Sequence, residues 1–446
     1  MHEWYPEPAS ARSDPVNAYC DELFATLARS DQRRWATVYL RGLLGLAGRK
    51  SLRRISEHVL GHSAVQSLQQ FVNQSPWEDD GVRQSLARLV SARMAPRAWA
   101  VEEVVFPKHG RYSAGVARQF VPSTGRVESC QLGLSVSLTD GTASVPVDWR
   151  LVLPRQWDDD ASLRAGAHLP AEQRHRSKVQ LTLDTLDGLV TDWRLRPAPV
   201  LLDARYERDL PALIRGLEER GLGYLVEVGE DSQLPVAARF RPAAPSALPH
   251  SAHRGVLVGA GFAGTSAPPR PTAPAGMREL IRQSAGGPAD AVPLHRLTVA
   301  EAVRGAGTET GRATMAWREG IEGRLQSSQF LVVQLPAAHD PARRLSSAPR
   351  RLIMQWPAGR PRPRACWLTN LSGRVLPELI GLAKMRWRPQ YDLNRMREEF
   401  GLTDFEGRSF RGWHHHVTLV SAAYGFHCLE RLEARRAAGE PYLPAA

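Results

Sequence analysis

The feature that most constrains the fold is a change in the spacing of apolar residues at residue 98. Before it, apolar residues recur at helical spacing and predict helices over residues 16–27, 32–46, 51–59, 64–73 and 81–94. We expect Ser51 and Asp80 to be N-caps here. After it, segments between turn signals predict strands over residues 99–108, 116–121, 127–138 and 145–153. The chain must therefore join a helical N-terminal segment to a sheet.

Helix and strand alternate after this meander. The pattern predicts, in order, a helix over residues 178–193, a strand over 199–203, a helix over 210–220 and a strand over 223–228. Meandering strands followed by alternating helix and strand predict an α/β fold with an RNase H-like core.

The composition shifts to Ala, Pro and Gly over residues 235–295, which we interpret as a flexible insertion. It contains a G-x-G-x-x-G run at residues 259–264, but the prolines that follow cannot open the helix that a dinucleotide site requires. Strands return over residues 314–318, 329–335, 351–356 and 365–371, and helices over 376–387, 389–400 and 414–437 complete the chain.

At 446 residues the chain is too long for one compact core. We expect an N-terminal helical, DNA-binding domain over residues 1–97 and the first part of the core over 98–234. An insertion that becomes β-rich after residue 295 covers 235–372, and C-terminal helices over 373–437 complete the core.

The helix near residue 390 is the best defined element of the C-terminal part. Leu393, Met396 and Phe400 give it one apolar stripe. Pro389 suits a first helical position, and Gly401 suits a left-handed residue that ends the helix.

The balance of charge is basic. The formal net charge is +12 and the pI is near 10.0, which favours nucleic acid as the partner, although a basic proteome gives the same bias. The four cysteines form no C-x-x-C pair, which argues against a zinc module. Neither a signal peptide nor an apolar run of membrane length is present, so we expect a cytoplasmic, nucleoid-associated protein that does not bind membranes.

Basic residues cluster between residues 29 and 54, including Arg49, Lys50 and Arg53. Short basic helices of this kind place one helix in a DNA groove. A solvated face on a helical bundle explains the charge pattern equally well.

Several segments in the same order resemble one family of bacterial insertion-sequence transposases, the IS seven-hundred-and-one family with its DDE endonuclease domain. They are Arg49-Lys50-Ser51, the strand at residues 99–108, Trp317-Arg318-Glu319-Gly320, the Arg386-Trp387 helix, and Glu406-Gly407-Arg408 with the His414-His415-His416 run. The resemblance implies an RNase H-like core, with a β-rich insertion before the last catalytic helix.

It also implies a site of three carboxylates that hold two Mg²⁺ or Mn²⁺ ions for DNA cleavage. The family's three acids fall on Glu102, Asp203 and Gln390. Glu102 replaces an Asp, and its extra methylene moves the carboxylate by roughly 1 Å. Gln390 carries no charge, so we expect Glu102 and Asp203 to be the only metal ligands of a degenerate triad, if the protein binds metal at all.

We assign DNA contacts to Lys108, Arg386 and Arg397 beside this site and to Arg49, Lys50 and Arg53 in the N-terminal helices. The resemblance places Arg386 and Arg397 where the family contacts phosphate. The three consecutive histidines face different ways on a helix, so we interpret them as a DNA-side or packing motif and not as metal ligands.

The first hypothesis is a transposase-derived protein that binds double-stranded DNA and has impaired or lost cleavage and strand transfer. Two alternatives stay open: a still-active Mg²⁺-dependent transposase, and reuse of the fold for other chemistry or a small ligand. The sequence leaves open whether the protein is an enzyme and whether it forms a homodimer.

Overall fold

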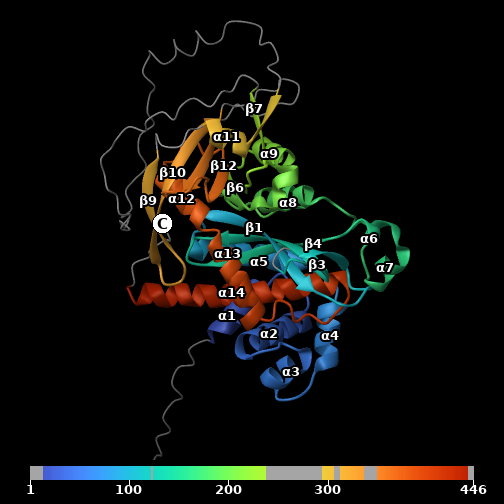
Figure 1. Cartoon of the computed structure of the whole chain (residues 1–446). Helices are drawn as coiled ribbons and strands as arrows, with labels where there is room; N and C mark the ends of the chain where they lie inside the picture. The colour runs from blue at the N-terminus through green and yellow to red at the C-terminus, as the bar shows by residue number, and fades with distance from the viewer. Residues whose placement is uncertain (1–13, 122–123, 238–293, 306–311, 336–348, 440–446) are drawn as a thin grey trace, which may run out of the picture.

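The computed structural model describes residues 14–121, 124–237, 294–305, 312–335 and 349–439. Most of the expected flexible insertion, and the whole G-x-G-x-x-G run, lie outside the described residues. Figure 1 shows a central sheet with helices on both sides and the N-terminal helices gathered at one end.

The N-terminal segment is helical, as its pattern predicts. The helices are α1 (Pro15–Leu23), α2 (Ser30–Gly45), α3 (Leu52–Leu60), α4 (Val65–Asn73) and α5 (Asp79–Met94). The Ser51 side chain caps α3 by accepting a hydrogen bond from the Arg54 amide at 3.4 Å. The expectation for Asp80 is wrong: α5 begins at Asp79, two residues before the predicted start, and Glu78 is the N-cap, so Asp80 lies inside its first turn.

One sheet of ten strands forms the centre of the molecule. Its first half is built from β1 (Ala98–Pro107), β2 (Ala117–Val121), β3 (Arg126–Thr139), β4 (Ser144–Val152), β5 (Val200–Leu202) and β6 (Tyr224–Val228). Strand β3 pairs antiparallel with β1, β2 and β4, whereas β1, β5 and β6 run parallel to one another. Four antiparallel strands, β1 to β4, followed by two strands that run parallel to β1, make the α/β, RNase H-like core that the sequence predicts.

The sheet continues past β6 through β12 (Ala365–Thr369), β11 (Arg350–Trp356), β10 (Arg324–Leu335) and β9 (Ala313–Glu319), all antiparallel. These are the strands expected in the β-rich insertion, and here they extend the central sheet. A separate two-stranded sheet joins β7 (Gln233–Ala237) to β8 (Leu294–Thr298), which is followed by α11 (Val299–Gly305).

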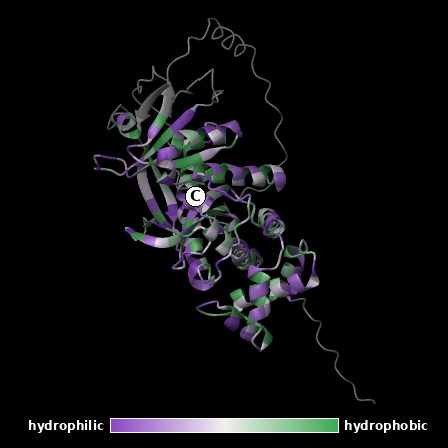
Figure 2. Cartoon of the chain, turned by 90° about the vertical axis from the view of Figure 1, so that its right-hand side faces the viewer, coloured by the Kyte–Doolittle hydropathy of each residue, from purple (hydrophilic) through white to green (hydrophobic). Residues whose placement is uncertain are grey.

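Alternate residues of the parallel strands face two hydrophobic cores. Trp99 and Val101 belong to the larger core, which also contains side chains of α8 (Lys178–Asp187) and α9 (Leu210–Glu219). Ala100 and Leu201 face a smaller core, which is covered by α12 (Leu376–Lys384). In Figure 2, hydrophobic and hydrophilic residues both occur along the helices and strands.

Shorter elements connect these parts: α6 (Gln156–Asp159), α7 (Ala161–Gly166), the π-helix η1 (Gly188–Asp192) and the 3₁₀ helix η2 (Ala204–Asp209). The C-terminal helix α14 (Phe410–Ala437) runs between the N-terminal helices and the sheet (Figure 1). Among the helices that the structure describes, none is long and apolar enough to cross a bilayer.

Helix α13 (Trp387–Glu399) differs from the expectation at its start and agrees with it at its end. It begins at Trp387, so Pro389 is its third residue and not its first. Proline is tolerated there because the first amides of a helix have no partner within it. Gly401 has a φ of +70° and follows the helix end, as predicted.

Candidate functional site

Glu102 and Asp203 are brought together by the register of two parallel strands. Trp99 pairs with Val200 and Ala100 with Leu201, and both acids lie two positions further along their strands. Because side chains alternate across a sheet, both acids continue the face that holds Ala100 and Leu201. Glu102 is 2% exposed, and Asp203 follows directly after β5.

The Arg386 guanidinium bridges these two acids. Its Nη2 lies 3.0 Å from Oε1 of Glu102 and 3.3 Å from Oδ2 of Asp203, and its Nη1 donates to the carbonyl of Val101 at 3.4 Å. Arg386 precedes α13 and follows Met385, which packs in the core under α12, so its position is set by both helices. The side chain is buried, and it binds carboxylates here instead of presenting a free charge to phosphate.

A second guanidinium completes the neutralisation of Asp203. Nε of Arg205 lies 2.9 Å from Oδ2 of Asp203, and the Arg205 amide donates to Oδ1 at 3.0 Å. Nη1 of Arg205 also donates to the carbonyl of Glu103 at 2.8 Å, and the Glu103 carboxylate pairs with Lys178. Arg205 is not among the site residues predicted from the sequence.

Burial dominates the electrostatics of Glu102. It raises the pKa of the carboxyl group to about 7, and Asp203 adds to the rise, whereas Arg386 and Arg205 oppose it. Near neutral pH the group is therefore close to half protonated. The cluster therefore consists of two carboxyl groups paired with two guanidinium groups, and burial makes Glu102 a weaker acid than usual.

Gln390 stands on the side of α13 that also carries Arg386 and Arg397, four and seven residues away, but its side chain is exposed. Within the described part of the chain, no hydrogen bond or ion pair joins it to Glu102 or Asp203. Arg397 is partly buried, and desolvation together with the nearby charge of Arg205 lowers its pKa. Its Nη1 donates to Oδ1 of Asn394 at 2.6 Å. Because Arg205 pairs with Asp203, the nearness of Arg397 to Arg205 places this face of α13 beside the acidic cluster.

The other cations assigned to DNA differ in their surroundings. Arg53 is exposed, and Arg49 is exposed and paired with Glu406. Lys108 is half-buried against Phe405, where burial lowers its pKa.

Lys50 contradicts the expectation of a surface contact. It is only 2% exposed, its ammonium donates to the carbonyl of Leu46, and Asp404 accepts from its backbone amide at 2.7 Å. Its position is that of a packing residue at the junction of α2 and α3 with the segment after α13.

The three histidines are packing residues. His415 stacks on Trp77, and its two ring nitrogens face the carbonyls of Val72 and Trp77, to one of which a neutral ring donates, while Nδ1 of His416 contacts the hydroxyl of Tyr39. Burial lowers the pKa of each of the three to about 4, so they are neutral. The part of the chain that the structure describes contains no group of three His, Cys, Asp or Glu placed to hold a metal ion.

A buried network around Asp392 fixes the opposite side of α13. Its carboxylate accepts from Nε and Nη2 of Arg388 at 2.7 and 2.8 Å, from the Tyr424 hydroxyl at 2.6 Å and from the Ser144 amide at 2.7 Å. These bonds join α13 to β4 and α14. No sequence pattern predicts this network, because its members come from three separate elements.

The model of the DDE superfamily endonuclease family matches residues 22–286, more than half of the chain. That range contains Glu102 and Asp203 and ends before α13. No curated protein matches. Among solved structures, a cryo-electron-microscopy structure of a piggyBac transposase synaptic complex with hairpin DNA aligns with 97% of this chain and 80% of its own, at 10% identity and a TM-score of 0.33. On the extent of the family match, the chain belongs to the DDE superfamily endonucleases.

Proposed function

We propose that the protein is a transposase-derived DNA-binding protein of the IS seven-hundred-and-one type whose catalytic centre is degenerate. The observation that carries this proposal is the state of the two acids. Arg386 and Arg205 neutralise Glu102 and Asp203, and the position of the third acid holds the amide Gln390.

The donor set does not fit the divalent ions that DDE superfamily endonucleases generally use. A pair of Mg²⁺ ions needs several ionised carboxylates whose oxygens are free to coordinate. Glu102 is buried with a pKa of about 7, Oδ2 of Asp203 pairs with the guanidinium groups of Arg205 and Arg386, and Oδ1 accepts from the Arg205 backbone amide. Gln390 contributes no charge to balance a cation. We therefore derive no cleavage step for this site.

DNA binding is supported by charge and by the position of the remaining cations. The net charge is +12, Arg397 and Arg205 lie beside the acidic cluster, and Lys108 adds a further cation after the end of β1. Neutralised acids also remove the repulsion that a phosphate would otherwise meet there. We propose that duplex DNA binds across this face in the cytoplasm, with the protein associated with the nucleoid. A homodimer, which would bring two DNA segments together, is part of the proposal.

The test is the salt dependence of binding to duplex DNA, followed by fluorescence anisotropy. Each phosphate contact contributes about −0.9 to the slope of log K against log salt. Arg397→Gln should lower the magnitude of this slope by roughly one. Arg374→Gln is the matched control, because Arg374 is exposed and follows β12, whose last residue pairs near the start of β6, at the other end of the strands from Glu102 and Asp203.

Affinity that does not change with salt, or an equal effect of the two substitutions, would contradict the proposed interface. No binding at low salt would remove the nucleic-acid function altogether.

A further inference from the structure

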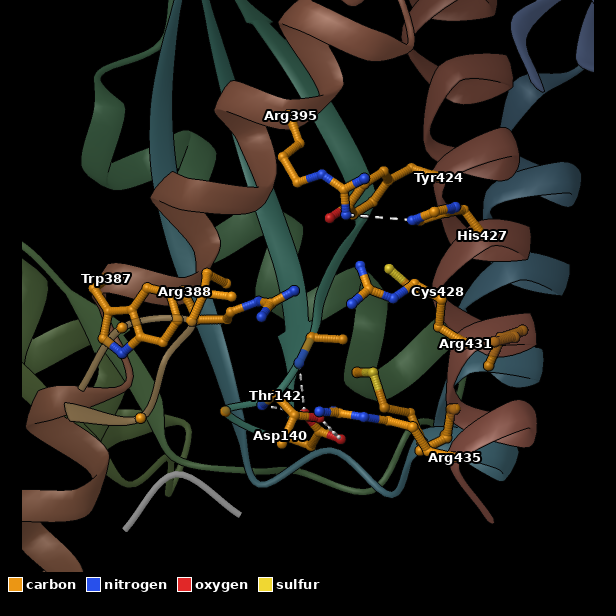
Figure 3. Close-up of a pocket in the computed structure, with 18 of the residues that line it drawn as sticks. Asp140, Thr142, Trp387, Arg388, Arg395, Tyr424, His427, Cys428, Arg431 and Arg435 are labelled. Carbon is orange, nitrogen blue, oxygen red and sulfur yellow. Dashed lines mark hydrogen bonds between the residues drawn. The ribbon is translucent and has the colours of Figure 1, made fainter. Parts of the chain in front are cut away.

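A pocket of about 320 Å³ lies on the other side of α13 from Gln390. Its walls come from α13, α14, the turn between β3 and β4 at Asp140–Ala143, and the hairpin between β9 and β10 at Gly320–Gly323. Its volume is at the lower end of the range for small-molecule sites, roughly 300–1,000 Å³. Figure 3 shows labelled side chains from both helices pointing into the space between them.

The pocket is strongly basic. The lining arginines are Arg318, Arg388, Arg395, Arg431 and Arg435, and His427 lies among them. The acids in the lining are Asp140 and Glu322. Asp140 already accepts from the amides of Thr142 and Ala143 at 2.7 and 2.8 Å, and Glu322 pairs with Arg324 at 2.8 Å. The arginines of the lining thus outnumber its two acids.

Two of these guanidinium groups are held rigidly. Asp392 binds Arg388 through Nε and Nη2, so Nη1 is not engaged by that carboxylate. Glu399 binds Arg395 through Nε and Nη2 at 2.8 and 2.6 Å, and Nη1 of Arg395 lies 3.3 Å from Nε2 of His427. Donors fixed before binding lose little conformational entropy when an anion arrives.

The pKa of His427 responds to the charges of the surrounding arginines. Burial lowers its pKa, and the charges of Arg395 and Arg431 lower it further. A neutral ring with Nε2 facing Arg395 is the acceptor in that contact. An anion placed between these arginines would offset their charge and make protonation of His427 easier.

The remaining wall is apolar and aromatic. It is formed by Trp387, Tyr424, Leu429, Leu432, Met94 and Ile321. Trp387 is only partly buried and packs edge-on against Tyr391. A ligand that fills both the arginine-lined part and the aromatic part of the pocket needs a multiply charged anion at one end and a flat, weakly polar body at the other. Arginine binds phosphate in a bidentate manner, and aromatic side chains bind the faces of nucleic acid bases.

We propose that this pocket binds a nucleoside phosphate, with the phosphate between the guanidinium groups of Arg388, Arg395 and Arg431 and the base against the aromatic wall. A free nucleotide and the 5′-phosphorylated end of a DNA strand share this chemistry. The proposal goes beyond DNA binding at the acidic cluster, because α13 separates the two sites.

The experiment is calorimetric titration of the full-length protein with inorganic phosphate, deoxyadenosine, deoxyadenosine monophosphate, and a short single strand with or without a 5′ phosphate. The nucleotide should bind at least tenfold more tightly than phosphate or nucleoside alone. Arg431→Gln should weaken it about tenfold, the loss of one charge-assisted hydrogen bond. Arg436→Gln is the matched control, on the same helix, with the same change of charge and outside the pocket lining.

A second readout is the titration of His427 by NMR, identified by its loss in His427→Gln. Bound nucleotide should raise the pKa of this ring. Binding of the free nucleotide identifies a small ligand, whereas binding of the phosphorylated strand alone identifies a DNA end. The proposal would be overturned if neither the nucleotide nor the 5′-phosphorylated strand bound more tightly than phosphate, if the two arginine substitutions had equal effects, or if the pKa of His427 did not change on binding.

Discussion

The buried carboxyl group of Glu102 gives a prediction whose size follows from the structure. Its pKa rises from an ordinary 4.5 to about 7 because the side chain is buried. One pKa unit corresponds to about 1.4 kcal/mol, so ionising Glu102 is less favourable in the folded chain than in the unfolded chain by roughly 3 kcal/mol. The protonated carboxyl group of Glu102 contributes its full stability below pH 4.5, and this contribution is lost as the pH rises through 7.

Glu102→Gln replaces the acid by a group that resembles its protonated form. The variant should therefore match the parent protein near pH 4.5 and exceed its free energy of unfolding by up to roughly 3 kcal/mol at pH 8. When the free energy of unfolding of the parent is subtracted from that of the variant at each pH, the contributions of all other titrating groups cancel. Glu398→Gln is the control, an exposed position on α13 where a surface change should alter stability by less than about 0.5 kcal/mol.

The assay is denaturant unfolding followed by tryptophan fluorescence from pH 4.5 to 8, together with titration of ¹³C-labelled glutamate carboxyl groups. The carboxyl signal that disappears in Glu102→Gln should titrate near pH 7. A signal that titrates near 4.5, or a stability difference that does not grow with pH, would refute the argument that burial outweighs the Arg386 ion pair.

Three further changes test the surroundings of α13. Asp392→Asn should lower the free energy of unfolding by about 3–5 kcal/mol, because Arg388 would remain buried without its counter-charge; denaturant unfolding measures this. Gly401→Ala should cost more than about 1 kcal/mol in the same assay, since φ is +70° and the new Cβ would meet Cγ of Lys50 at 2.4 Å. Gln390→Glu should raise the affinity for Mn²⁺, and adding Glu102→Asp should raise it further; calorimetry that shows no gain would contradict our account of the missing charge.

Elements with a strong local pattern could be predicted from the sequence. The strand that carries Glu102, the short buried strand before Asp203 and the end of α13 at Gly401 all have signals within a few residues. The start of α13 could not be located in the same way. It depends on the turn after α12, where the Arg388 amide bonds the carbonyl of Met385 at 2.9 Å, and not on Pro389.

Local sequence patterns could not predict which side chains from distant segments contact one another. The sequence resemblance places Arg386 near phosphate, but only the fold shows that its guanidinium lies between two acids. The burial of Lys50 depends on the segment around Asp404, more than 350 residues away. The basic pocket is assembled from five separate segments, and no local pattern in them predicts that they meet.

The central claim is that the acidic centre does not support cleavage, and metal-dependent nicking tests it most directly. The unmodified protein is incubated with Mg²⁺ or Mn²⁺ and supercoiled DNA that carries the sequences flanking its own gene. We predict DNA binding without nicks, because Glu102 and Asp203 are neutralised by arginine and Gln390 adds no charge. Nicks that require the metal and disappear in Asp203→Ala would contradict the account and establish an active transposase.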